Sequence, residues 1–204
     1  MKTANHVVCD LGGVLIDLDW FEKMRVLFPR LKEHDQLLKM WLSLDSVKSF
    51  ESGKSEFNQF YEAFISETGI SMTCEDFRRD FCSIIGAVKE RGIEILTKIK
   101  AQAHLSLLSN TNPLHIETLN AQTDLLSHFD QLFLSYEIKL VKPDMAIYHK
   151  VCRQLNTAPE SVYFFDDNRE NIASAAACGI NAYRVTSPTD ILEILSAQNW
   201  FEVI

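Results

Sequence analysis

Carboxylate, hydroxyl and ammonium side chains recur where short apolar segments of the chain end. They are Asp10 after Val7–Cys9, Ser109 at the end of residues 104–109, Asp166 and Asp167 after Phe164-Phe165, and Lys142 in the loop before Pro143. Carboxylates are ligands that Mg²⁺ prefers, and a lysine and a hydroxyl can hold the oxygens of a phosphate group. A carboxylate can also attack phosphorus as a nucleophile. These residue types predict a site that binds a hard cation together with a phosphate.

Alternating strands and helices would bring these residues to one edge of a sheet. The run Val7-Val8-Cys9 before Asp10, with Gly12-Gly13 after it, predicts a buried strand that opens into a flexible turn. From residue 87 onward we expect strands at 104–109, 131–134, 161–165 and 181–185, and helices at 88–102, 114–122, 144–155, 169–178 and after Pro188. This order is typical of an α/β fold with a Rossmann-like, doubly wound parallel sheet, in which ligands bind at the carboxyl ends of the strands.

A helical insert interrupts this pattern after the first strand. Aromatic residues and leucines recur at spacings of three and four, so residues 20–85 are predicted to be entirely helical. Asp19 as a cap, a break at residues 53–55, and the capping-box spacing of Thr73 and Asp76 divide the insert into several helices. We therefore expect an α/β core of residues 1–16 and 87–204 and a helical cap of residues 17–86.

The cap holds many aromatic residues, and we expect most of them to form its own hydrophobic core. The set comprises Trp20, Phe21, Trp41, Phe57, Phe60, Tyr61 and Phe64. Trp20 and Phe21 come soon after the first strand, at the expected hinge between core and cap, and are therefore candidates for the wall of a substrate pocket. None of the six histidines has metal-ligand spacing.

The composition argues against several classes of protein. The 204 residues are 47% hydrophobic, but no apolar run reaches the roughly 20 residues needed to cross a bilayer. The net charge of −8 and the scattered lysines and arginines argue against nucleic-acid binding, which depends on clustered positive charge. We see no export signal, and five cysteines without CxxC spacing favour reduced thiols in a cytoplasmic protein. The oligomeric state stays open.

Four segments, taken in order, resemble the four motifs of the haloacid dehalogenase-like (HAD) superfamily. They are Asp10-Leu11-Gly12-Gly13-Val14-Leu15, Leu107-Leu108-Ser109-Asn110, Val141-Lys142-Pro143-Asp144 and Phe164-Phe165-Asp166-Asp167-Asn168. The helical insert lies where members with a C1 cap carry it. The sequence looks most similar to the bacterial subgroup that includes α-D-glucose-1-phosphate phosphatase. The resemblance implies an Mg²⁺-dependent hydrolase of a small phosphate ester, such as a sugar phosphate, that works through an aspartyl-phosphate at Asp10.

The resemblance also implies a role for each matching residue. Asp10 would be nucleophile and metal ligand, the carbonyl of Gly12 and the carboxylate of Asp167 would be metal ligands, and Asp166 would act beside them or through a water. Ser109 and Lys142 would bind the phosphate. Asn110 and Asn171 would orient the phosphate loop and the metal site.

One departure from the family pattern concerns the proton donor. Most phosphatases of this superfamily have a second aspartate two residues after the nucleophile, where this chain has Gly12. Positioned acid–base catalysis typically contributes about 10² to 10⁴ in rate. Asp17, Asp19 or a metal-ordered water are candidates to replace the missing group.

The departure leaves two alternatives to a phosphatase. The first is a phosphate-binding or regulatory protein that kept the fold and lost turnover. The second is a 2-haloacid dehalogenase, which the pair Asp166-Asp167 argues against because that branch weakens its acidic pair. The sequence does not identify the substrate, since cap contacts enclose the leaving group in this fold.

Overall fold

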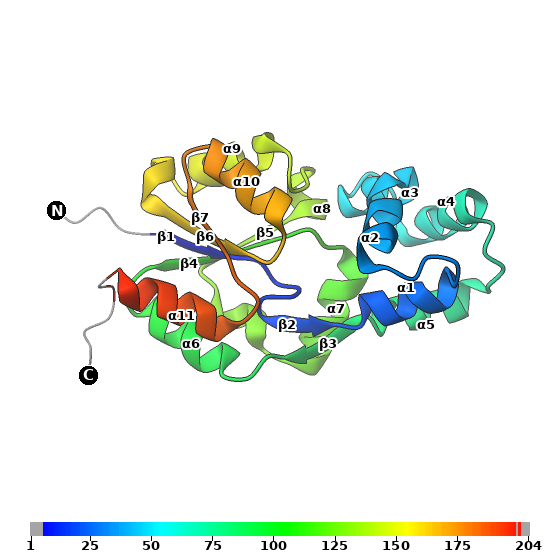
Figure 1. Ribbon diagram of the computed structural model, residues 1–204, viewed down its shortest axis with the longest axis horizontal. Helices are drawn as coiled ribbons and strands as arrows, with labels where there is room; N and C mark the ends of the chain where they lie inside the picture. The colour runs from blue at the N-terminus through cyan, green and yellow to red at the C-terminus, as the bar shows by residue number, and fades with distance from the viewer. Residues whose placement is uncertain (1–5, 199, 201–204) are drawn as a thin grey trace.

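A five-stranded parallel sheet forms the centre of the larger part of the molecule. The computed structural model describes residues 6–198 and 200 (Figure 1). The strands are β1 (His6–Cys9), β4 (His104–Ser109), β5 (Gln131–Leu134), β6 (Val162–Asp166) and β7 (Asn181–Arg184), in the order β5-β4-β1-β6-β7. The predicted α/β fold with a parallel sheet is confirmed. Because Cys9 pairs with Leu107 of β4 and Phe165 of β6, the carboxyl end of β1 lies between the ends of its two neighbours.

Helices cover both faces of this sheet. One face packs against α6 (Gly92–Lys100), α7 (Pro113–Gln122), the 3₁₀ helix η1 (Leu125–His128) and α11 (Pro188–Ala197); the other packs against α8 (Ser135–Ile138), α9 (Met145–Gln154) and α10 (Arg169–Ala177), and the short η2 (Pro159–Ser161) precedes β6. In β1 the side chains of Val7 and Cys9 join one hydrophobic cluster and Val8 joins the other, since successive residues of a strand face opposite sides. Burial on both faces explains why this strand is an unbroken apolar run.

The insert between β2 and β3, which we expect to act as the cap, consists of five helices. They are α1 (Trp20–Leu27), α2 (His34–Ser43), α3 (Asp45–Glu51), α4 (Phe57–Thr68) and α5 (Cys74–Cys82), and they lie at the opposite end of the molecule from α6 and α11 (Figure 1). Their apolar faces enclose a separate cluster, in which the rings of Phe50 and Phe60 stack with centroids 4.5 Å apart. The expected break between α3 and α4 is present. Thr73 caps α5 by accepting a hydrogen bond from the Asp76 N–H at 3.1 Å.

Two short strands connect the core to the cap. β2 (Ile16–Leu18) and β3 (Ile85–Val88) form an antiparallel pair, and the expected boundaries at residues 16/17 and 86/87 fall inside it. The prediction of continuous helix up to Ile85, and of a helix from Val88, is wrong at these ends: Ile85–Val88 is a strand, and α6 begins only at Gly92. The strand exists because β2, distant in sequence, pairs with it. Asp19 does occupy the position before α1, but its side chain makes no capping hydrogen bond.

The helices of the described residues are at most 12 residues long. Over residues 6–198 and 200, none of them combines the length with the apolar character that crossing a bilayer requires.

Candidate active site

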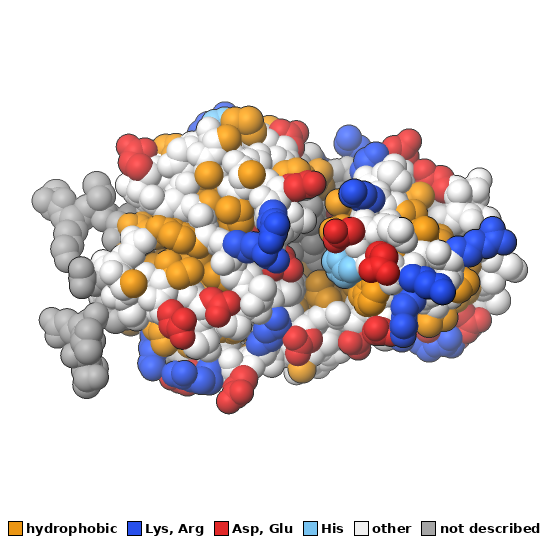
Figure 2. Space-filling model, viewed as in Figure 1, with side chains coloured by type: hydrophobic (Ala, Val, Ile, Leu, Met, Phe, Trp, Pro, Cys, Tyr) orange, Lys and Arg blue, Asp and Glu red, His pale blue; other side chains and the backbone are white. Residues whose placement is uncertain are grey.

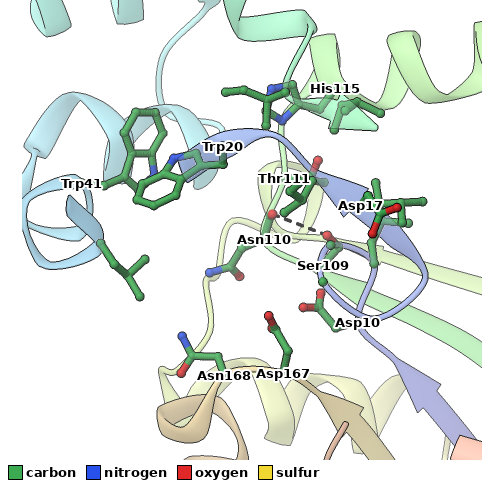
Figure 3. Close-up of a pocket in the computed structure, with 18 of the residues that line it drawn as sticks. Asp10, Asp17, Trp20, Trp41, Ser109, Asn110, Thr111, His115, Asp167 and Asn168 are labelled. Atoms are coloured by element: carbon green, nitrogen blue, oxygen red, sulfur yellow. Dashed lines mark hydrogen bonds between the residues drawn. The ribbon is translucent and has the colours of Figure 1, made fainter. Parts of the chain in front are cut away.

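A pocket of about 470 Å³ lies between the carboxyl ends of the strands and the cap. Its floor includes Asp10, Ser109 and Asp167, and its opposite wall includes Trp20 and Trp41 of the cap. The space-filling view shows the surface hollowed between these two parts of the molecule (Figure 2). The close-up shows Asp10, Ser109, Asn110 and Asp167 around the same space, with the two tryptophans beside it (Figure 3). The pocket therefore joins residues from distant parts of the sequence, from Asp10 to Asn171.

Three carboxylates meet at the floor of the pocket. Asp10 follows β1, Asp166 ends β6 and Asp167 comes next, and one carboxylate oxygen from each lies within 4.8 Å of the others. Asp10 and Asp166 are buried, with exposed fractions of 8% and 0%. Lys142 lies between them: its Nζ is 2.7 Å from Asp10 Oδ1 and 2.6 Å from Asp166 Oδ2, and it donates to the Leu108 carbonyl at 3.1 Å. Lys142 thus pairs with two of the three carboxylates.

Burial perturbs the charges of this cluster. Burial, with Asp166 and Asp167 nearby, raises the pKa of Asp10 to about 7, although Lys142 opposes the shift. The pKa of Asp167 is also raised, by burial and by Asp166. Burial alone would lower the pKa of Lys142, but Asp10 and Asp166 raise it above its ordinary value. The cluster concentrates more negative than positive charge in a desolvated place, which favours a bound cation.

The donor set suits Mg²⁺. Carboxylate and carbonyl oxygens are the ligands of hard cations, and Mg²⁺ is usually bound by one or two carboxylates, waters and substrate phosphate. At Gly13, where φ is +74°, an added Cβ would overlap the carboxylate of Asp167. The turn after β1 thus leaves room for this carboxylate only because residue 13 has no side chain. The residues present therefore fit a magnesium ion.

Asp166 differs from its two neighbours because protein donors occupy its oxygens. Asn171 Nδ2 lies 3.0 Å from both carboxylate oxygens, the Asn168 N–H donates to Oδ1 at 2.8 Å, and Lys142 holds Oδ2. Asp166 is thereby oriented from three sides. The expected roles, in which Asp166 supports the metal site while Asp10 and Asp167 bind the metal, stay predictions.

The end of β4, the neighbour of β1, supplies further polar groups next to Asp10. Ser109 is buried, and its Oγ donates only a long hydrogen bond, 3.4 Å, to the Asn110 carbonyl (Figure 3). The Asn110 side chain accepts from the Lys142 N–H at 2.8 Å and donates to the Lys142 carbonyl at 2.9 Å. The amide of Asn110 therefore positions the backbone from which Lys142 reaches the carboxylates.

At Gly12, which has no side chain, a neighbouring residue occupies the space beside the backbone. Gly12 lines the pocket, and the Cδ1 atom of Leu18 lies 2.5 Å from the place where its Cβ would be. Asp17 also lines the pocket, but its side chain is 65% exposed and lies 3.8 Å from Lys89 Nζ. Asp19 directly precedes α1 and is not among the residues that line the pocket. Leu18 fills the space that a second aspartate would need.

Several pocket residues were not expected from the sequence. They are Trp41, Glu51, Lys89, Thr111 and His115. His115 is neutral and held in place: burial lowers its pKa to about 4, its Nε2 lies 3.0 Å from the Phe81 carbonyl, and its ring stacks on Phe81 with centroids 4.3 Å apart. No motif or spacing marks these positions, because they reach the pocket only through packing of the cap and the turns onto the core.

Comparisons with known proteins agree with this geometry. The model of the haloacid dehalogenase-like hydrolase family matches residues 4–179. A D-ribitol-5-phosphate phosphatase from Bacteroides thetaiotaomicron is 23% identical over 192 residues, which cover 91% of this chain and 93% of the relative. A sesquiterpene phosphatase from Aspergillus oryzae is 25% identical over 190 residues, 90% of this chain and 91% of the relative.

A solved structure has the same fold. It is a HAD family enzyme from Bacteroides thetaiotaomicron, in complex with magnesium and inorganic phosphate, and it is 24% identical to this chain. The two structures superpose with a TM-score of 0.72 over 89% of this chain and 94% of the other.

Proposed function

The chain belongs to the haloacid dehalogenase-like hydrolase family, and from that premise we propose that it is an Mg²⁺-dependent phosphatase whose nucleophile is Asp10. The observation that carries the proposal is the position of Asp10 at the end of the central strand, 2.7 Å from the Lys142 ammonium and clustered with Asp166 and Asp167. Two relatives that align along nine-tenths of the chain are phosphatases by name, which supports the same chemistry.

The proposed metal ligands are Asp10, the carbonyl of Gly12, and Asp167, with Asp166 supporting them. When bound, Mg²⁺ would polarise the phosphoryl group and neutralise part of its charge. Lys142 and Ser109 would hold the phosphoryl oxygens that face the core. Since Lys142 is already in contact with Asp10, it would also hold the nucleophile and the phosphate close to each other.

Asp10 would take part in two successive displacements at phosphorus. In the first, an oxygen of its carboxylate forms a bond to phosphorus while the bond to the leaving alcohol breaks, which leaves an aspartyl-phosphate. In the second, water forms a bond to phosphorus and the bond to Asp10 breaks, which releases inorganic phosphate and restores the carboxylate. Nearly complete burial of Asp10 removes competing water from the nucleophile.

The proposed substrate is a small phosphorylated metabolite, such as a sugar phosphate, handled in the cytoplasm. A pocket of about 470 Å³ suits a leaving group of this size, and the tryptophan rings of Trp20 and Trp41, with centroids 6.0 Å apart, offer it apolar surface. Five cysteines with free thiols agree with a reducing compartment.

A phosphate-binding protein without turnover is the second candidate function. The observation that favours it is Gly12, where Leu18 occupies the space of the usual acid. The two candidates differ in one property, release of phosphate, because both would bind Mg²⁺ and phosphate at the same carboxylates.

The test is Mg²⁺-dependent phosphate release from p-nitrophenyl phosphate and from a panel of sugar and polyol phosphates. We expect Asp10→Asn, or removal of Mg²⁺ with EDTA, to lower turnover by about 10³-fold or more, since the nucleophile or its activating ion is lost. Asp124→Asn, at an exposed position outside the pocket, is the matched control and should keep full activity. Halide release from 2-chloropropionate would instead indicate a dehalogenase. Binding of Mg²⁺ and phosphate without any release would indicate the binding protein.

A further inference from the structure

The proposed function leaves one chemical requirement unmet, and the inference below depends on that function. An alkoxide that leaves phosphorus needs a proton, because it is a strong base. Displacement at phosphorus is in line, so the leaving oxygen departs opposite to Asp10, on the side of the cap. Gly12 offers no proton there, and Leu18 fills the space beside it. A proton donor therefore has to come from another part of the pocket.

Four titratable pocket residues outside the carboxylate cluster are poorly suited to this task. Asp17 is largely exposed and faces Lys89 at 3.8 Å, while Lys89 Nζ donates to the Gly13 carbonyl at 2.6 Å and to the Thr186 carbonyl at 2.7 Å. His34 is more than half exposed and lies 3.8 Å from Asp35. His115 is held by the Phe81 carbonyl and has no proton to give at neutral pH, given its lowered pKa of about 4.

Glu51 is the remaining titratable side chain that lines the pocket in the described residues. It is the last residue of α3, on the cap side, and it is partly buried. Burial raises its pKa to about 7, while the Trp41 indole and the Lys142 ammonium oppose the shift. A carboxyl group in this environment exists in both protonation states near neutral pH, which is the property that acid catalysis requires.

The backbone around Glu51 is tied to the core. Ser135 Oγ donates to the Glu51 carbonyl at 2.6 Å and accepts from the Thr111 N–H at 2.9 Å, so one hydroxyl joins α3 to the loop after β4. Two residues on, Lys139 Nζ donates to the Gly53 carbonyl at 2.6 Å. The end of α3 accordingly lies beside α8 (Figure 1).

These contacts decide where Glu51 can act. Thr111 directly follows Ser109 and Asn110, which lie at the phosphate side of the pocket, so the hydroxyl of Ser135 fixes the start of the Glu51 side chain relative to that loop. Gly53 packs closely enough against Tyr136 that an added Cβ would overlap its carbonyl. A residue on the cap is thus held in a defined position over the catalytic floor.

We propose that Glu51 is the proton donor to the leaving-group oxygen. It takes the role that a second aspartate has in most phosphatases of this superfamily, where this chain has Gly12. As the bond between phosphorus and the leaving oxygen breaks, the Glu51 carboxyl group gives its proton to that oxygen and the neutral alcohol departs. In the second step, the Glu51 carboxylate takes a proton from the water whose oxygen bonds to phosphorus. The residue ends the cycle protonated, as it began.

The test compares two substrates that differ in their need for a proton. A primary alkyl phosphate, such as a pentitol phosphate, releases a strongly basic oxygen, whereas p-nitrophenyl phosphate releases a weakly basic phenolate. Because kcat/KM includes steps only up to departure of the alcohol, it reports the first transfer. For Glu51→Gln we expect kcat/KM to fall about 10²- to 10⁴-fold on the alkyl phosphate and less than about tenfold on the aryl phosphate. Retained aryl phosphatase activity would also show that the variant folds.

Two variants complete the experiment. Glu62→Gln, on the exposed face of α4 in the same cap, should match the wild type on both substrates. Glu51→Asp keeps the acid but withdraws it by one methylene, and should show a smaller loss with the same preference between substrates. An equal loss on both substrates in Glu51→Gln, or no loss on either, would overturn the assignment of Glu51. A wild type that releases phosphate from neither substrate would instead overturn the proposed function, and this inference with it.

Discussion

Replacement of Gly13 by alanine would test how the turn after β1 builds the metal site. Gly13 has a φ of +74°, and a Cβ there would overlap the carboxylate of Asp167. Its own carbonyl also accepts a hydrogen bond from Lys89 at 2.6 Å. Alanine would therefore cause two separable effects, strain in the backbone and displacement of a proposed metal ligand.

The two effects have different magnitudes. The left-handed conformation costs an alanine about 1–2 kcal/mol, and the smaller freedom of the unfolded chain offsets about 0.4–1 kcal/mol of that cost. Gly69 is the matched control, since its φ is +69° and nothing lies within 4 Å of an added Cβ. Gly69→Ala should thus lower the free energy of unfolding by no more than about 1.5 kcal/mol and leave the metal site intact. Gly13→Ala should lose more stability than Gly69→Ala and bind Mg²⁺ at least about tenfold more weakly.

Urea unfolding without metal and calorimetric titration with Mg²⁺ would measure the two effects. A Gly13→Ala variant that binds Mg²⁺ with wild-type affinity would refute the reasoning that glycine makes room for Asp167. Equal losses of stability in Gly13→Ala and Gly69→Ala would show that the overlap is relieved without cost.

Three further predictions concern the cap and the sheet. Ser135→Ala should lower the free energy of unfolding by about 1–3 kcal/mol, because buried partners of its hydroxyl, among them the Glu51 carbonyl, lose their hydrogen bonds. Phe60→Ala should cost about 3–5 kcal/mol, since the ring is 1% exposed and fills the centre of the cap. Asp130→Asn should lower the free energy of unfolding by about 0.5–1 kcal/mol at neutral pH, because the amide can still accept from the Leu105 N–H, 2.9 Å away, but loses the charge that strengthens this bond and pairs with Lys100 at 3.2 Å. Urea unfolding would measure all three.

The loss of stability in Asp130→Asn should depend on pH, and the pKa of Asp130 predicts the direction. Burial works against the charged form, but the Leu105 N–H and Lys100 outweigh it and lower the pKa of Asp130. A lowered pKa stabilises the fold above the ordinary pKa of aspartate, and this stabilisation disappears as the pH falls through the folded-state pKa. The difference between Asp130→Asn and wild type should therefore shrink in acid. A difference that stays constant with pH would contradict the assignment.

The controls for the other two variants are an exposed apolar side chain of the cap and a serine whose hydroxyl bonds within its own helix. Val26→Ala, at a cap position that is 76% exposed, should change stability by less than about 0.5 kcal/mol. Ser196→Ala removes a hydroxyl that bonds only within α11, and should cost less than Ser135→Ala. If Phe60→Ala were no more harmful than Val26→Ala, the cap would not depend on its aromatic cluster.

Much of the fold could be predicted because the signals are local. Strand β1 is buried on both faces and so reads as an unbroken apolar run, and Thr73 marks the start of α5 with a side chain that satisfies a free N–H. β3 could not be predicted in the same way. Ile85–Val88 is a strand only because Ile16–Leu18 pairs with it across about 70 residues of cap, and no local pattern records that partner.

In the candidate site, too, some features could be predicted from the sequence and others could not. The sequence by itself determined that Asp10, Ser109, Asp166 and Asp167 would converge, because residues at the carboxyl ends of neighbouring parallel strands must meet at one edge of the sheet. Their catalytic roles stay predictions. Only the tertiary structure decided that Leu18 fills the space beside Gly12 and that Glu51 faces the pocket from the cap. Those positions depend on how two separately packed hydrophobic clusters dock against each other, through contacts such as that of Ser135 with the end of α3, and residue spacing along the chain carries no information about such docking.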